Sequence, residues 1–125
     1  KSVISSFLLM DNSGEKISTA LINNPDADFL DLEEKTLGID HAKAGYLITK
    51  HWRLPEVLQN VVLYHHTPMD APVVYRTQCF CVHLADVVAM MSGIDTCLDG
   101  LHYKIDPFFE DYFKISEQSF FKIII

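Results

Sequence analysis

Apolar side chains recur along this chain three and four residues apart, and they hardly ever alternate regularly with polar ones. The stretches that follow this spacing end at turn signals: Gly38, Leu54-Pro55, the run 67–72 with its two prolines, and Gly93. Spacing of this kind indicates amphipathic helices, whereas strict alternation indicates strands. The pattern therefore predicts an all-α fold.

Start and stop signals divide the pattern into about six to seven helices. Asp40 is a good N-cap, Gly38 suits the position just after a helix, and Pro55 suits a first helical turn, where its missing N–H costs nothing. The predicted helices are Glu15–Ile22, Asp28–Leu37, His41–Trp52, Pro55–His66 and Tyr75–Met91, then a short one from Asp106-Pro107 and a last one capped by Ser116.

The length of 125 residues fits one domain or part of one. Residues 3–10 are apolar without a helix start, and the chain stops on three isoleucines without a C-cap, so we interpret 1–125 as a fragment of one larger helical domain. No apolar run approaches the roughly 18 residues that cross a bilayer. Without a secretory signal either, a cytoplasmic location without membrane contact is predicted.

The charge balance and the cysteine spacing argue against nucleic-acid binding and against a cysteine-based zinc site. Seventeen acidic residues face ten basic ones, for a net charge of −7, and no basic stripe could neutralise phosphates, so direct nucleic-acid binding is not expected. Five of the acids lie within 26–34, where we expect a solvated face around a helix start. Cys79, Cys81 and Cys97 lack a zinc-type spacing and are predicted to be reduced thiols.

Three histidines and one carboxylate are the candidate site residues. His65 and His66 close one apolar helical stretch, His41 begins the preceding helix, and Asp86 lies inside the following one. On core-facing stripes such groups need partners, because an unpaired buried polar group costs about 1–3 kcal/mol. Imidazoles and a carboxylate are metal ligands. We therefore expect these four side chains to converge, as a metal site or what remains of one.

Simpler readings of the same residues stay open. Asp86 could instead make a local contact with His83, three residues earlier on the same helix. One of His65 and His66 could be a core residue while the other caps the helix C-terminus, where a cation is favoured. The inner face of the helix that carries Asp86 is predicted to hold Cys79, Val82, Asp86, Ala89 and Met90.

One face of the predicted helix 41–52 combines small and large residues. Ala44 and Gly45 are small enough to let another helix approach closely. Trp52 lies on the same face as His41, and we expect Trp52 and Leu54 to be core anchors that fix how two helices meet.

Four segments together resemble the HDOD domain, a helical relative of the HD metal-dependent phosphohydrolases and of the HD-GYP cyclic-dinucleotide phosphodiesterases. The resemblance is clearest over residues 28–93. It implies an HD-domain-like helical bundle in which His41, His65, His66 and Asp86 match metal ligands of catalytic HD-GYP relatives. The metal would be a divalent ion such as Fe, Mn, Zn, Mg or Ni. The segments are Leu37-Gly-Ile-Asp-His-Ala-Lys-Ala-Gly45, Trp52-Arg-Leu-Pro55, Tyr64-His-His-Thr-Pro68 and Leu84-Ala-Asp86.

The chain also departs from its catalytic relatives. The His-Asp doublet of the superfamily is missing, and Lys1 would be the lysine that follows it. Thr67-Pro68-Met69-Asp70 replaces the acidic residue and Gly-Tyr-Pro segment that follow the paired histidines in HD-GYP enzymes. These departures favour a non-catalytic domain.

The resemblance thus implies a bacterial regulatory output module. Such a module would bind a protein partner, a sensory or receiver domain among them, or a small nucleotide signal, and it could form oligomers. The alternative is a metal-dependent phosphohydrolase whose remaining ligands lie upstream. A third reading is a nucleotide pocket that kept the shape of the old active site without its chemistry.

Overall fold

The computed structural model describes residues 13–24, 27–91 and 105–124. Within these ranges every regular element is a helix, which confirms the predicted all-α fold. None of these helices is long and apolar enough to cross a bilayer. In chain order the elements are α2 (Ser13–Asn23), α3 (Phe29–Leu37), α4 (His41–His51), α5 (Glu56–Tyr64), the 3₁₀ turns η1 (Pro68–Asp70) and η2 (Val73–Tyr75), α6 (Arg76–Met91), α7 (Phe109–Phe113) and α8 (Glu117–Ile124).

The predicted cap residues form the helix ends. The Asp28 side chain accepts hydrogen bonds from the first backbone N–H groups of α3, and Asp40 accepts one from Lys43 N at 2.7 Å at the start of α4. Gly38 ends α3 with φ 77°, a left-handed conformation that glycine adopts without steric cost. Because α5 already ends at Tyr64, the paired histidines lie just beyond it rather than inside it.

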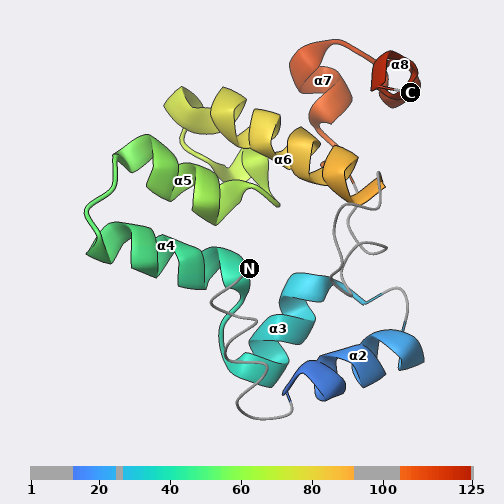
Figure 1. Cartoon of the computed structure of the whole chain (residues 1–125). Helices are drawn as coiled ribbons and strands as arrows, with labels where there is room; N and C mark the ends of the chain where they lie inside the picture. Colours follow the sequence, from blue (N-terminus) through green and yellow to red (C-terminus); the bar gives the residue numbers. More distant parts are fainter. Residues whose placement is uncertain (1–12, 25–26, 92–104, 125) are drawn as a thin grey trace.

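The helices α4, α5 and α6 lie side by side in one row, in which α5 is antiparallel to α4 and runs roughly parallel to α6 (Figure 1). The pair α2 and α3 stands near the first turn of α4 and has its own small core of Ile17, Leu21 and Phe29. At the other side of the row, α7 contacts α6 through stacked rings of Phe80 and Tyr112, 4.4 Å between centroids. This arrangement brings the first residue of α4 next to the last turn of α5.

The buried face of α6 differs from the predicted one. Val82 is 41% exposed, while Phe80, His83 and Val87 are buried together with the predicted Cys79 and Met90. The buried stripe is thus rotated by about one residue toward His83. The interior accepts this histidine because both of its ring nitrogens have backbone partners there.

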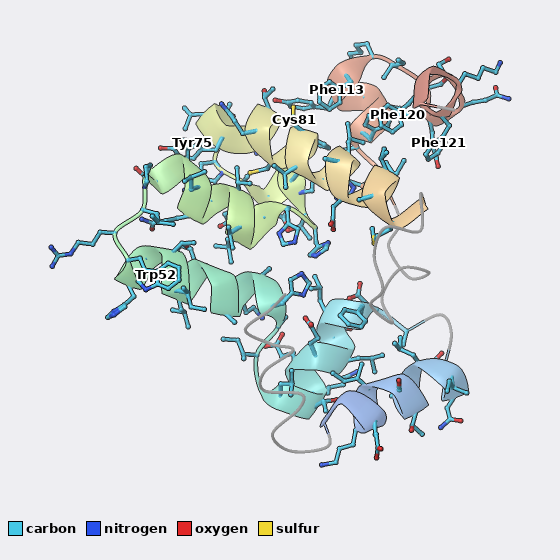
Figure 2. All side chains as sticks on the ribbon, viewed as in Figure 1. Trp52, Tyr75, Cys81, Phe113, Phe120 and Phe121 are labelled. Carbon is cyan, nitrogen blue, oxygen red and sulfur yellow. The ribbon has the colours of Figure 1, made fainter. Side chains whose placement is uncertain are left out.

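The prediction that Trp52 anchors the core is wrong. The helix α4 ends at His51, and the Trp52 ring is 67% exposed beyond that end, as Figure 2 shows at the tip of α4. Leu54 is only half-buried. The turn is instead held by its backbone, with bonds from Trp52 N to Ile48 O and from Leu54 N to Thr49 O.

Aromatic rings join α7 to α6 on one side and to α8 on the other. Phe109 is fully buried, and its ring lies edge-on to Phe120 of α8 at 5.2 Å between centroids. Figure 2 shows Phe113 and Phe120 at the corner between α7 and α8. The Tyr112 hydroxyl also hydrogen-bonds the Thr77 hydroxyl at 2.7 Å, so α7 is fixed to α6 by both apolar and polar contacts.

Gly45 is the point of closest approach between α4 and α5, as its small size predicts. A Cβ at this position would lie 2.6 Å from Cγ1 of Val62, and a β-branched side chain has little freedom to move away. Gly45→Ala should gain about 1 kcal/mol in helix propensity but lose about 1–3 kcal/mol to overpacking, for a net destabilisation of up to about 2 kcal/mol in urea unfolding.

The double variant Gly45→Ala/Val62→Ala provides the control. Because Val62→Ala removes the clashing methyl group, the double variant should be more stable than the sum of the two single effects. Strict additivity would show that the helices do not meet at this point.

Candidate metal centre

Three of the four predicted site residues meet at one point. His41 is the first residue of α4, and His65 and His66 directly follow α5. The His41 Nε2 atom lies 3.3 Å from His65 Nε2 and 2.7 Å from His66 Nε2. In the described part of the chain these three histidines form a group whose ligand atoms all lie within 4.8 Å of one another.

A buried carboxylate orients His41. Glu33 Oε2 lies 2.7 Å from His41 Nδ1 and also accepts the backbone N–H of His41 at 2.9 Å. Glu33 is 3% exposed and His41 7%, so water does not compete for this contact. Since a carboxylate can only accept, Nδ1 carries the proton and Nε2 is the atom turned toward the other two histidines.

A backbone carbonyl orients His65 in the same way. His65 Nδ1 lies 2.8 Å from the carbonyl oxygen of Val62, one turn earlier. Nδ1 must donate in this bond, so the neutral ring of His65 also presents an Nε2 lone pair to the centre. Acceptors behind the ligating histidines are typical of metal sites, where they fix the tautomer and the ring orientation.

Two such lone pairs 3.3 Å apart repel each other unless a cation lies between them. The 2.7 Å contact between His41 and His66 likewise requires one proton shared by their two Nε2 atoms. A divalent metal ion can replace that proton, because it binds the same lone pairs and balances the Glu33 carboxylate nearby. A neutral His66 with its proton on Nε2 can supply the shared proton, and a metal ion would take the place of that proton.

The spacing suits a transition-metal ion. Two nitrogens bound to one tetrahedral zinc, each at about 2.0–2.1 Å from the ion, are about 3.4 Å apart. The His41–His65 separation of 3.3 Å is close to this value, while the His41–His66 pair, at 2.7 Å, would have to open by about 0.7 Å on metal binding. Imidazole favours Zn, Fe, Ni and Cu, whereas Mg²⁺ prefers oxygen ligands. Three imidazole ligands therefore favour a transition-metal ion over Mg²⁺.

Asp86, the fourth predicted residue, is not a member of the three-histidine group. It lies half-buried on α6 with its Oδ2 atom inside. Its negative charge slightly raises the pKa of His83, but both ring nitrogens of His83 bind other partners, so the predicted local contact is not the one that holds His83. The assignment of Asp86 as a metal ligand stays a prediction.

His83 is a buried histidine that the sequence analysis placed only as a neighbour of Asp86. Burial lowers the pKa of His83 below its usual value, so the ring is held neutral. The hydrogen bond to the His65 carbonyl and the charges of Asp106 and Asp86 partly offset that effect. His83 is 2% exposed and lies directly behind the backbone of His65, with Nδ1 2.7 Å from that carbonyl oxygen.

Glu33 is one of the acids of 26–34 that the sequence predicts to be solvated, yet its side chain is buried. Its neighbours Asp31 and Glu34 are indeed exposed. Glu33 follows Phe29 by four residues and precedes Leu37 by four, on the face of α3 that turns inward. This spacing was the signal in the sequence that could have distinguished it.

Comparison with known proteins identifies the family of the chain. The searches among curated proteins and among solved structures found no match. The HDOD domain family model matches residues 4–68, just over half of the chain. The matched segment contains Glu33 and all three clustered histidines, and it stops before α6. The chain belongs to the HDOD domain family.

Proposed function

We propose that this chain is a regulatory module of bacterial signal transduction, located in the cytoplasm, whose three-histidine site binds one divalent transition-metal ion. Membership of an HD-related family supports a scaffold derived from metal-dependent phosphohydrolases. The observation that carries the proposal is the convergence of three Nε2 atoms, two of them oriented by acceptors behind the rings.

The ligand set supports signal binding rather than hydrolysis. Phosphodiester hydrolysis commonly uses two metal ions about 3.5–4 Å apart, whereas three nitrogens within 4.8 Å supply the ligands of one. Neutral imidazoles leave the full charge on that ion, so its remaining coordination position would attract an anionic group. Such a group could come from a nucleotide signal or from a carboxylate of a protein partner.

The charges around the site also support signal binding rather than hydrolysis. A phosphodiesterase needs cations that stabilise the transition-state charge. Lys43 follows His41 on α4, but its ammonium group is held by Glu34 at 2.7 Å and Asp40 at 3.1 Å. Between Arg53 and Arg76, the interval that contains the paired histidines, the sequence has no lysine or arginine.

A metal-dependent phosphohydrolase is the second candidate. Three histidines with one open position also occur in catalytic zinc sites, where the fourth ligand is an activated water. The same cluster would then need further ligands to hold a second ion.

Metal binding is tested first. Calorimetric titration of the chelator-treated protein with Zn²⁺ should give about one ion per chain, and His66→Ala should weaken binding at least about 10-fold. His51→Ala, which removes an exposed histidine at the far end of α4, should leave binding unchanged. Equal loss in both variants would mean that zinc binds non-specifically to surface histidines.

Glu33→Gln tests the orientation of His41. The amide keeps an acceptor for Nδ1 but removes the negative charge that strengthens Nε2 as a ligand, so Zn²⁺ affinity should fall about 10–100-fold. Glu34→Gln is the matched control, because Glu34 is exposed and contacts Lys43 instead. If Glu34→Gln lowers the affinity as much, the effect comes from overall charge rather than from the Glu33–His41 contact.

Catalysis is tested with cyclic dinucleotides and bis-p-nitrophenyl phosphate in the presence of Mn²⁺, Fe²⁺ or Zn²⁺. The regulatory assignment predicts no turnover above that of the buffer with metal. Metal-dependent hydrolysis that disappears in a His65→Ala/His66→Ala variant would establish the phosphohydrolase instead.

A further inference from the structure

His83 forms a link between two distant backbone segments. Its Nδ1 atom lies 2.7 Å from the carbonyl oxygen of His65, and its Nε2 atom accepts the backbone N–H of Asp106 at 2.9 Å. One segment closes the metal centre, and the other leads into α7.

A single protonation state satisfies both bonds. Because the Asp106 N–H can only donate and the His65 carbonyl can only accept, the ring must be neutral with its proton on Nδ1. Both ring nitrogens are then used, and the ring is almost completely enclosed. A shift of either backbone segment would leave a buried ring nitrogen without its partner.

The His65 end of this link belongs to the metal centre. The His65 ring is fixed by the Val62 carbonyl through Nδ1 and faces His41 through Nε2. A metal ion on that Nε2 atom would hold the His65 ring, and with it the peptide whose carbonyl accepts the hydrogen bond from His83. Fixing the position of His65 would therefore also fix the position of the His83 ring.

The Asp106 end belongs to the docking of α7. The Asp106 side chain accepts the backbone N–H of Phe108 at 2.8 Å, just before α7 begins. Independently of His83, α7 is held on α6 by Tyr112, which stacks on Phe80 and bonds Thr77. The docking of α7 can therefore be perturbed at Tyr112 without touching the metal centre.

We propose that His83 is a positioning residue that couples metal occupancy of the three-histidine site to the docking of α7 on α6. This inference rests on the proposed metal binding. An ion on the histidines stabilises the docked α7, and by thermodynamic reciprocity the docked α7 strengthens metal binding. The helices α7 and α8 are then the part of the molecule that reports the state of the site to a partner.

A double-mutant cycle tests the coupling. Tyr112→Ala loosens α7 and should weaken Zn²⁺ binding about 5–10-fold in the wild-type background, the lower range of allosteric coupling. The same substitution should change the affinity less than about 2-fold once His83 is replaced. Lys122→Ala, at an exposed position of α8, is the neutral control.

Two replacements of His83 each keep one of its two hydrogen bonds and remove the other. His83→Asn puts an amide nitrogen about where Nδ1 lies and keeps the bond to His65, while His83→Gln puts its amide oxygen about where Nε2 lies and keeps the bond to Asp106. Both should abolish the coupling, although His83→Asn should retain most of the Zn²⁺ affinity. A purely structural role of His83 would not separate affinity from coupling in this way.

Hydrogen exchange gives a second measurement that needs no Tyr112 variant. Zn²⁺ should slow exchange of the Asp106 and Phe108 amides in the wild-type protein but not in His83→Asn or His83→Gln. If Tyr112→Ala does not fold, Tyr112→Phe, which removes only the Thr77 bond, should weaken Zn²⁺ binding by a smaller factor.

Two results would overturn the inference while leaving the metal site intact. One is Zn²⁺ binding to the histidines that Tyr112→Ala leaves unchanged, and the other is the same weakening by Tyr112→Ala in all His83 backgrounds. Absence of Zn²⁺ binding in the wild-type protein would instead overturn the proposed function, and the coupling with it.

Discussion

The Glu33 carboxylate holds His41 with its Nε2 atom aimed at two other histidines, and the centre depends on that contact. Three imidazoles do not meet by chance in a protein interior, because their lone pairs repel and their desolvation is costly. Here a carboxylate and a backbone carbonyl fix two of the rings from behind. The cluster is therefore oriented before any ion arrives, which lowers the cost of ordering the ligands on binding.

The helices bring these rings together through one close approach. Gly45 lets α4 lie against Val62 of α5, so the beginning of α4 reaches the end of α5. No side chain of α5 is fully buried, although α4 and α6 flank it, since the three helices form a row with open faces. The centre thus lies at the end of a helix pair, partly enclosed and within reach of a ligand.

His83 and Trp52 show how far an apolar pattern decides burial. Trp52 continues the inward face of α4 in the sequence, yet the helix ends one residue earlier and the ring is mostly exposed to solvent. His83 has a polar ring beside an apolar stripe, yet it is enclosed because two backbone groups from other segments satisfy it. Periodicity gives the direction of a side chain along a helix, but what stands opposite depends on where neighbouring elements end.

The sequence by itself determined the all-α class, the helix limits within a few residues, and the histidines that would meet, because caps, prolines and apolar spacing act locally. It also carried the HDOD resemblance, which the family comparison confirmed. Only the tertiary structure decided that Glu33 is buried and contacts His41, unlike the exposed acids around it. It also decided that the three-histidine group does not include Asp86, and that His83 connects the end of α5 to the segment before α7. Those outcomes depend on which buried donors and acceptors find partners across helices, and a partner 8, 18 or 23 residues away leaves no periodic trace in the chain.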